Sequence, residues 1–280
     1  MTGGSVGLGA TGDALVVGQQ SASERRGWHR RGMALFIGEL EVIAAKGWRT
    51  TEEERLGGWL LRAAQGFTGR ANSALAAGDP GIPPGEAALA VRRWYAERDL
   101  PAMVAVPYPL GRPGDSDTDR FLVQHGWGIR ADPAVVMTAP AAAVARPQLA
   151  ERVDLHPEPT QAWLDHYRGK HLPPVARQLL SAQFQAFASI RRDGEIVAIG
   201  RVAVAAGWGG LTAVEVHPGH RRTGLGTAIT AALAAAAAAQ GAVSLYLQVA
   251  VGNQAARALY ARAGFIEHHG YHYRVASAVG

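Results

Sequence analysis

The chain of 280 residues contains no cysteine. Without thiols it forms no disulfide bond and no thiolate metal site, and it carries no acyl group on a cysteine during a reaction. Any acyl chemistry in this chain must therefore be direct or use another nucleophile.

Lysine is almost as scarce, because only Lys46 and Lys170 are present and arginine supplies nearly all the positive charge behind the net charge of +5. Arginine suits bidentate contacts with phosphate. A GC-rich genome also produces a chain rich in alanine, glycine and arginine, whatever its function. We interpret the four arginines within residues 25–31 as the solvated start of a helix, and we expect no nucleic-acid partner.

Long hydrophobic runs are also missing. The longest apolar stretch, residues 228–239, is almost all alanine and falls short of the ~20 residues that span a bilayer. Residues 1–20 are rich in glycine, serine and threonine and have neither a basic segment nor an apolar core of the kind found in signal peptides. We therefore expect a cytoplasmic protein with no membrane partner.

Hydrophobic residues make up 48% of the chain and charged residues 18%, a balance typical of folded proteins. Because the commonest domains have ~100–150 residues, the length favours two domains. We predict a flexible tail at 1–24, an N-terminal domain at 25–138, a linker rich in alanine and proline at 139–150, and a C-terminal domain at 151–280.

The second half has the stronger structural signals. An Asp-Gly turn separates the first two of three β-like runs, which favours a hairpin. The expected elements in order are strands at Phe187–Arg192, Glu195–Val204 and Leu211–His217, a helix at Gly224–Gln240, a strand at Ser244–Val249, a helix from Asn253 to Gly264, and a strand at Tyr271–Ala276. This order predicts an α/β fold with a mixed, mostly antiparallel twisted sheet flanked by helices.

The segment that carries chemistry is residues 211–227, where a strand runs through a glycine-rich turn directly into the long helix. Free N–H groups converge at a helix start, and the helix dipole adds to their attraction for anions. Gly224 and Gly226 let a phosphate approach the backbone, and Arg221 and Arg222 supply counter-charge. The pattern predicts a phosphate-binding loop.

The sequence Arg221-x-x-Gly224-x-Gly226, after a strand that ends in Val214-Glu215-Val216-His217-Pro218, resembles the coenzyme A signature of the GNAT superfamily of N-acetyltransferases. A second signature of that family follows at the expected distance, with Asn253, Ala256, Leu259-Tyr260 and Ala263-Gly264-Phe265. The resemblance covers about residues 151–280. It implies acetyl-CoA as co-substrate and no metal.

The resemblance also implies roles for individual residues. The backbone N–H of Val216 would stabilise the oxyanion, and Tyr260 would protonate the departing thiolate. The implied coenzyme A contacts are Val214, Glu215, Val216, Arg221, Arg222, Thr223, Gly224, Leu225, Gly226, Thr227, Asn253, Ala256 and Tyr260. Asn253 also suits a helix N-cap, and Tyr260 lies seven residues later on the same helix face.

The general base departs from the family pattern, because Thr212 occupies the position where many members carry an acid or imidazole group. Glu215 is the only carboxylate on the strand, and strict alternation would direct it to the opposite face from Thr212. Bulges occur beside active sites and would reverse that direction. We therefore name Glu215 as the predicted base.

The first half resembles a degenerate copy of the second. Its expected elements are a helix at Met33–Lys46, β-like runs at Gly58–Ala63 and Phe67–Leu75, a helix at Glu86–Arg98, a strand at Ala102–Val106, a helix at Asp117–His125 and a strand at Pro133–Thr138. Gly81–Gly85 stands in place of the phosphate loop and contains two prolines, and Leu122 stands in place of Tyr260. We expect a GNAT-like fold without catalysis that supports the acceptor site; an unrelated α/β domain is the alternative.

Two further patterns fail as sites. Residues 7–12 match G-x-G-x-x-G, but too few residues precede them to form the strand that a dinucleotide site requires. The histidines at 268, 269 and 272, like the pair His166 and His171, lack the cysteines or carboxylates of a metal site. We interpret these histidines as surface residues.

The sequence thus predicts an acetyl-CoA-dependent N-acetyltransferase whose acceptor is a small-molecule amine, with one working site in the second half. It gives no oligomeric state. An acyl-CoA-binding regulatory protein without turnover is an alternative that Thr212 favours and Tyr260 opposes. A protein acetyltransferase acting on lysine or an N-terminus is another, because fold does not fix the acceptor.

Overall fold

The computed structural model describes residues 37–130, 133–150, 153–167, 172–181 and 184–277. Residues 36–280 form one compact unit. The predicted tail at 1–24, the arginines at 25–31, the motif at 7–12 and His171 lie outside the described residues.

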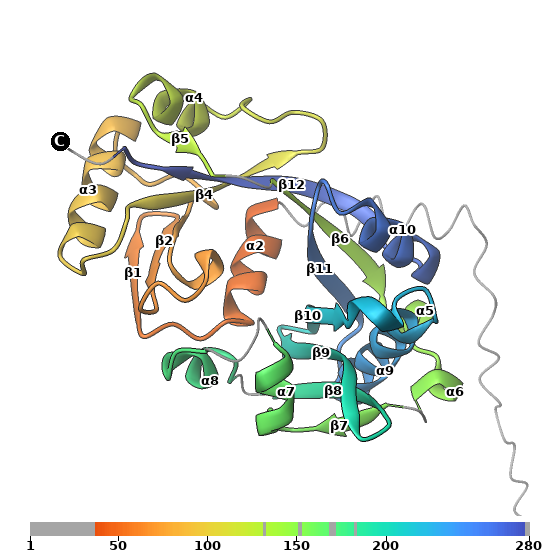
Figure 1. Cartoon of the computed structure of the whole chain (residues 1–280). Helices are drawn as coiled ribbons and strands as arrows, with labels where there is room; N and C mark the ends of the chain where they lie inside the picture. The colour runs from red at the N-terminus through yellow and green to blue at the C-terminus, as the bar shows by residue number, and fades with distance from the viewer. Residues whose placement is uncertain (1–36, 131–132, 151–152, 168–171, 182–183, 278–280) are drawn as a thin grey trace, which may run out of the picture. The chain divides into compact units, whose positions relative to one another are not determined.

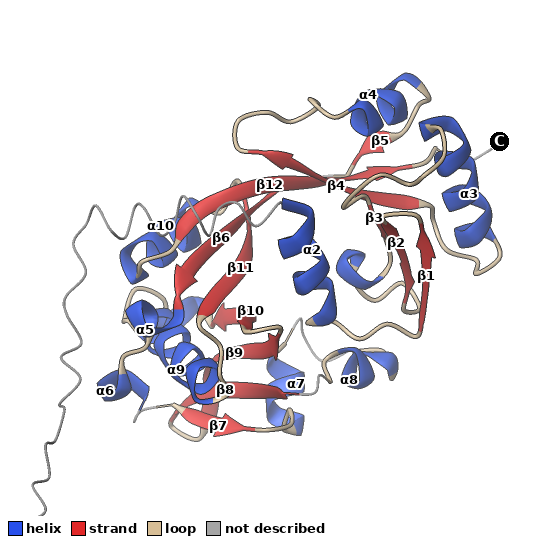
Figure 2. Ribbon diagram, turned by 180° about the vertical axis from the view of Figure 1, so that it is seen from behind, coloured by secondary structure: helices blue, strands red, loops and turns tan. Residues whose placement is uncertain are grey.

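One sheet runs through the described residues in the order β1-β2-β3-β4-β12-β6-β11-β10-β9-β8-β7, with β5 beside β12 (Figures 1 and 2). The strands are β1 (Glu52–Leu56), β2 (Trp59–Ala63), β3 (Ala74–Leu75), β4 (Met103–Pro109), β5 (Gly128–Ile129), β6 (Ala134–Pro140), β7 (Asp154–His156), β8 (Phe184–Arg192), β9 (Glu195–Ala205), β10 (Trp208–Val216), β11 (Ser244–Ala250) and β12 (Ile266–Val275). Only two of the described pairs, β3 with β4 and β10 with β11, are parallel. The predicted mixed, mostly antiparallel fold is confirmed.

Helices cover both faces of this sheet. They are α2 (Ile37–Lys46), α3 (Pro84–Ala96), α4 (Asp117–Gln124), α5 (Ala141–Val144), α6 (Pro147–Ala150), α7 (Gln161–His166), α8 (Val175–Leu179), α9 (Leu225–Ala239) and α10 (Gln254–Ala263), with single 3-10 turns at η1 (Gly69–Ala71) and η2 (Pro218–His220). Alternate residues of β6 separate the two faces, since Val136 packs with α2 whereas Val135 and Met137 pack with α9. We call these the α2 face and the α9 face.

The alanine-rich helix α9 lies unusually close to the sheet. A Cβ on Gly200 would come within 2.5 Å of Ile229, and one on Gly209 within 2.8 Å of Ala237. Glycines in β9 and β10 and alanines in the helix therefore fit each other. The small side chains bury the helix against the strands that carry the predicted site.

The last strands of the two halves are exchanged. β6 follows the helices of the first half but pairs with β11 along its whole length, whereas the C-terminal part of β12 pairs with β4 and β5. The N-terminal part of β12 in turn pairs with β6. Each half therefore contributes a strand to the interior of the other half's sheet, as the long β12 in Figure 1 shows.

The segment predicted as a linker at 139–150 is regular. It contains the end of β6, then α5 and α6, and both helices contact α9. Alanine and proline indicated a loop, but Pro140 precedes α5 as its N-cap and Pro147 begins α6, both positions where proline is tolerated.

Part of the first half also differs from the expected elements. The run predicted as a strand at 67–75 is instead η1 followed by the short β3. The strand β1 was not predicted because Glu52, Glu53 and Glu54 have low strand propensity. Charged side chains on an edge strand protect it from pairing with other chains.

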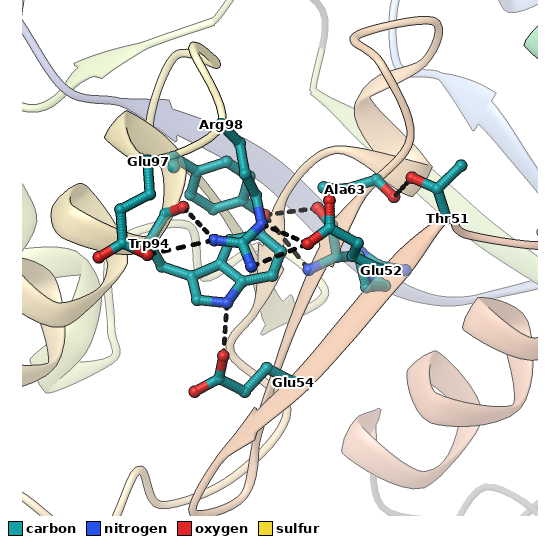
Figure 3. Close-up of polar contacts among 9 residues, drawn as sticks. Thr51, Glu52, Glu54, Ala63, Trp94, Glu97 and Arg98 are labelled. Atoms are coloured by element: carbon teal, nitrogen blue, oxygen red, sulfur yellow. Dashed lines mark hydrogen bonds and ion pairs between the residues drawn. The ribbon is translucent and has the colours of Figure 1, made fainter.

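Polar contacts attach α3 to this edge strand, as Figure 3 shows. The indole N–H of Trp94 donates to Glu54 at 2.6 Å, and Arg98 forms an ion pair with Glu52 at 2.9 Å. The Arg98 guanidinium also lies 3.7 Å from the centre of the Trp94 ring. These contacts hold α3 against β1 in a part of the first half for which no site is predicted.

The prediction that the histidines of β12 lie on the surface is wrong. His269 is fully buried and its Nε2 lies 2.8 Å from a carboxylate oxygen of Glu41 on α2. His272 is buried on the other face, 2.7 Å from Asp119 on α4. The exchange of β12 places these residues in the middle of the sheet, where imidazole pairs with carboxylates from helices on each face.

Candidate active site

The parallel strands β10 and β11 separate near their midpoints. They pair from Trp208 with Ser244 to Leu211 with Leu247, and beyond that point each continues without the other. The N–H of His217 donates to β9. Because N–H groups alternate along a strand, the N–H of Val216 is directed toward the gap. The gap therefore exposes backbone donors.

A bulge in β10 sets the direction of Glu215. Thr212 pairs with Arg201 and Glu215 with Ile199, so an advance of three residues along β10 matches an advance of only two along β9. Ala213, inside this bulge, has a φ of 53°. One extra residue reverses the alternation. Thr212 and Glu215 consequently lie on the same face, the α2 face, which is the arrangement that strict alternation would have excluded.

The loop between β10 and α9 has the geometry of an anion site. The N–H groups of residues 222–227 donate no hydrogen bond to any described residue. Arg222 has a φ of 66°, and Gly224 has a φ of 86° and is the N-cap of α9. The Arg221 guanidinium donates to the carbonyl of Val216 at 3.2 Å, which fixes a positive charge beside the helix start.

The two glycines of the loop serve different purposes. A Cβ on Gly224 would meet nothing within 4 Å, so its left-handed backbone is the constraint. A Cβ on Gly226 would come within 2.8 Å of Leu259 on α10. Gly226 thus permits close packing of α9 against α10, a role that the sequence prediction of phosphate access did not include.

A cleft of about 880 Å³ joins the loop, the gap and α10. All of the residues predicted to bind coenzyme A line this cleft except Thr223, whose hydroxyl instead donates to the carbonyl of His220 at 2.7 Å. The side chain of Asn253 accepts from the N–H of Ala256 at 3.1 Å, as expected of an N-cap. The cleft thus brings together both predicted motifs.

Tyr260 is one of the residues that line this cleft. Its side chain is 8% exposed and its ring makes an edge contact with Phe265. Burial raises the pKa of the Tyr260 hydroxyl to about 12. The hydroxyl makes no hydrogen bond to a described residue, so its proton is available to a group in the cleft.

A smaller cleft of about 210 Å³ also reaches Tyr260. It shares Val214, Glu215, Asn253, Ala256 and Tyr260 with the large cleft. Its remaining walls come from both halves of the chain and include Trp48, Arg70, Tyr167, Thr212 and Gln248. The gap between β10 and β11 thus has a large cleft and a small one that meet at Glu215 and Tyr260.

Another titratable group borders the large cleft. His166, at the end of α7, lines it, and burial together with the nearby charge of His217 lowers the pKa of its imidazole. A lowered pKa keeps His166 neutral near pH 7. The pair His166 and His171 was interpreted as surface residues; His166 is half-buried at the site.

Sequence reasoning missed the residues that the first half contributes. Arg70 lies 178 positions before its hydrogen-bond partner Gln248, and no local pattern links them. Gln248 itself gave a usable signal, because it is the one polar residue inside an apolar strand. Over the described residues, no group of three or more acidic or histidine side chains is arranged to hold a metal ion, and no helix is long and apolar enough to cross a membrane.

Comparisons with known proteins give consistent matches. The family model described as "Probable histone acetyltransferase Rv0428c C-terminal" matches residues 36–274. An uncharacterized N-acetyltransferase, YobR of Bacillus subtilis, is 28% identical over 251 residues, which cover 85% of this chain and 98% of the relative. The probable histone acetyltransferase Rv0428c of Mycobacterium tuberculosis is 30% identical over 257 residues, covering 87% of this chain and 75% of the relative.

Solved structures share the fold. A GCN5-related N-acetyltransferase from Kribbella flavida has a TM-score of 0.63 at 20% identity, covering 87% of this chain and 96% of its own. A tandem GNAT protein from the clavulanic acid biosynthesis pathway has a TM-score of 0.52 at 16% identity, covering 68% of each chain.

Proposed function

This chain belongs to the GNAT N-acetyltransferases, and we propose that it transfers the acetyl group of acetyl-CoA directly to a primary amine of a small molecule. It is an acetyl-CoA-dependent acyltransferase by family. The observation that carries the proposal for its acceptor side is the pair of clefts that meet at Glu215 and Tyr260.

The large cleft fits the co-substrate. The unbonded N–H groups of residues 222–227, the start of α9 and Arg221 suit a pyrophosphate. The unpaired edge of β10 beyond Leu211 offers donors to an extended amide-bearing arm, as an added strand would use them. Acetyl-CoA supplies an activated thioester at the gap.

The chain's own groups then serve the transfer. Glu215 accepts a proton from the substrate ammonium, whose pKa near ~10 leaves little free amine at pH 7. The amine forms a C–N bond with the acetyl carbon while the N–H of Val216 donates to the carbonyl oxygen. As the C–S bond breaks, Tyr260 donates its proton to the sulfur, and the remaining excess proton on the substrate nitrogen returns to Tyr260 as the neutral amide forms. The products are the N-acetylated amine and free coenzyme A.

The acceptor class has a specific competitor. One relative is called a probable histone acetyltransferase, which favours a lysine side chain in a protein as the acceptor. The small cleft, at about 210 Å³, is below the ~300–1,000 Å³ of pockets for drug-sized ligands and favours a small amine. Residence of the enzyme in the cytoplasm is part of this proposal.

Thiol release from acetyl-CoA over a panel of amines and a histone-tail peptide tests the proposal. We expect transfer to small amines and a drop in kcat of about 10²-fold in Glu215→Gln, with loss of the acidic limb of the pH profile. Glu195→Gln, at an exposed glutamate on the adjacent strand β9, is the matched control and should leave kcat unchanged. An unaltered pH profile in Glu215→Gln, with a loss in His166→Gln, would assign the base to His166 instead.

Preference for the histone-tail peptide would replace the small-molecule acceptor with a protein one. If acetyl-CoA binds in calorimetry but no acceptor is modified, the chain is a regulatory binder rather than an enzyme.

A further inference from the structure

The small cleft contains an arginine without a counter-charge. Arg70, on η1 of the first half, donates through Nε to the side-chain oxygen of Gln248. The Tyr271 hydroxyl lies 3.5 Å from that same oxygen. Among the described residues, no carboxylate forms an ion pair with the Arg70 guanidinium, whose side-chain hydrogen-bond partners are the uncharged Gln248 and Tyr271.

Some of the partly buried arginines elsewhere in the described chain are paired with carboxylates. Arg274 binds both oxygens of Asp119, at 2.7 and 3.0 Å, and Arg257 pairs with Glu267 at 2.5 Å. A guanidinium that has lost water without gaining a carboxylate is costly. Arg70 therefore lacks the carboxylate that Arg274 and Arg257 have, and it lines a cleft from which a ligand could supply one.

Two further buried arginines strengthen the positive charge around this cleft. Arg201 is fully buried and donates only to uncharged oxygens, the carbonyls of Leu180 and Gly47 at 2.9 Å and the hydroxyl of Thr212 at 3.4 Å. Arg62 is 5% exposed and donates only to oxygens of Ser73.

An aromatic ring and the nearby carboxylates determine the electrostatic surroundings of Arg70 in the small cleft. The centre of the Trp48 ring lies 6.0 Å from the Arg70 guanidinium and 5.5 Å from that of Arg201. The nearby carboxylates have other tasks, since Glu41 binds His269 at 2.8 Å and Glu215 lies where the two clefts meet. The positive charges exceed the negative ones on this side of the gap.

We infer that the acceptor is a small primary amine that also carries an anionic oxygen group, a carboxylate or a phosphate, which the Arg70 guanidinium binds. The inference rests on the proposed acetyl transfer and names its substrate class. The planar fork of arginine matches both anions with paired hydrogen bonds. With the anion at Arg70 and the amine near Glu215, the substrate spans the small cleft. The same charges repel a lysine-rich peptide or a polyamine.

Matched amine pairs test this inference. Glycine with glycinamide, 4-aminobutyrate with its amide, and phosphoethanolamine with ethanolamine differ by one anionic group each, and spermidine and a lysine-rich peptide serve as cationic acceptors. Because the members of a pair differ in the pKa of their amine, rates are compared at equal concentrations of the deprotonated amine. We expect kcat/KM to be at least about tenfold higher for the anionic member, and the three pairs to distinguish carboxylate from phosphate.

Arg70→Gln should abolish that preference by raising KM for the anionic member while leaving the neutral member within about threefold. Arg130→Gln is the matched control. Arg130 is exposed and lies beside η1, where a Cβ on Gly69 would come within 2.9 Å of it, but it lines neither cleft. It should preserve the preference.

A binding measurement separates the two levels of the proposal. Calorimetry of the coenzyme A-loaded full chain with the N-acetylated acid and the N-acetylated amide should show tighter binding of the acid, lost in Arg70→Gln. This result with no turnover would overturn the proposed transfer and keep the anion site. Equal binding of acid and amide, or turnover that favours spermidine or the lysine-rich peptide, would overturn the anion site and leave acetyl transfer standing.

Discussion

The helices α4 and α10 end in the same way in the two halves of the molecule. In each, a left-handed glycine follows the helix, and the N–H of the next aromatic residue returns to the carbonyl five residues earlier. The pairs are Trp127 with Leu122 at 2.9 Å and Phe265 with Tyr260 at 3.0 Å. Leu122 therefore occupies the place of Tyr260, in the same hydrogen-bonded frame, and has no proton to donate.

The loops that precede α3 and α9 differ more. Two arginines and the N-cap Gly224 precede α9, where a row of N–H groups has no partner among the described residues, whereas the N-cap Pro83 and the first residue Pro84 of α3 lack N–H groups. The first half thus shares the helix end of the second, but its loop before α3 lacks the features of the anion site. The comparison teaches that a few positions in this fold decide the chemistry, while the hydrogen-bonded frame survives without them.

Separating the halves should have the largest effect. A fragment of residues 141–280 lacks β6, which forms the neighbour of both β11 and β12. We expect no cooperative unfolding transition and no acetyl-CoA binding from this fragment alone, and recovery of both when residues 36–140 are co-expressed. Circular dichroism on heating and calorimetry measure these outcomes. A stable, binding-competent fragment would show that the exchanged strands are dispensable.

Removing the acid should have the next largest effect. Tyr260→Phe keeps the ring and its contact with Phe265 but removes the proton, so kcat should fall by about 10²-fold with acetyl-CoA affinity within about threefold. Tyr95→Phe in the first half is the contrast, because the Tyr95 hydroxyl donates to the carbonyl of Arg62 at 2.8 Å. It should lower stability by about 1 kcal/mol without changing kcat. Equal behaviour of both variants would make Tyr260 structural.

The loop comparison predicts a smaller effect. Gly224→Asp adds a carboxylate at the start of α9, and acetyl-CoA affinity should fall at least tenfold, about 1.4 kcal/mol. Gly81→Asp in the loop before α3 is matched to it, since Gly81 has a φ of 75° and also has nothing within 4 Å of its Cβ position. Both variants incur backbone strain, but only the first should weaken binding in calorimetry.

The same titrations measure stoichiometry, and the wild-type protein should bind one acetyl-CoA per chain.

The smallest effect concerns alkaline pH. The acid must be protonated to act, so the raised pKa of Tyr260, to about 12, extends activity upward. With an acceptor that is already deprotonated, kcat should change by less than about twofold between pH 9 and 11; an acid with the ordinary pKa of ~10 would lose about tenfold by pH 11. The second outcome would indicate that burial does not protect the hydroxyl during turnover.

The site residues that sequence could predict are those whose chemistry is local. The loop from Arg221 to Thr227 and the spacing from Asn253 to Tyr260 lie within single turns and helices, where capping and periodicity decide the structure. The direction of Glu215 depended on a bulge that β10 does contain, but its position, at Ala213, follows from pairing with β9 rather than from β10 alone.

What sequence could not predict depends on distant partners. Arg70 is held by a hydrogen bond to Gln248, and His269 is paired in the core with Glu41 on α2. Both partners are far away in the sequence. The histidines were interpreted as surface residues because no cysteine or well-spaced carboxylate accompanies them in the sequence. The strand exchange put them in the core, and no periodic pattern within β12 distinguishes a strand that joins its own half from one that joins the other.

The exchange of β12 also sets a schedule for biosynthesis. Domains usually fold in the order in which they leave the ribosome. Here the strand that lies between β4 and β5 follows the helices and strands of the second half in the sequence, so the sheet of the first half closes only after β12 has been synthesised. The sheets of the two halves therefore close together, and a chain that stopped before β12 would leave both without a central strand.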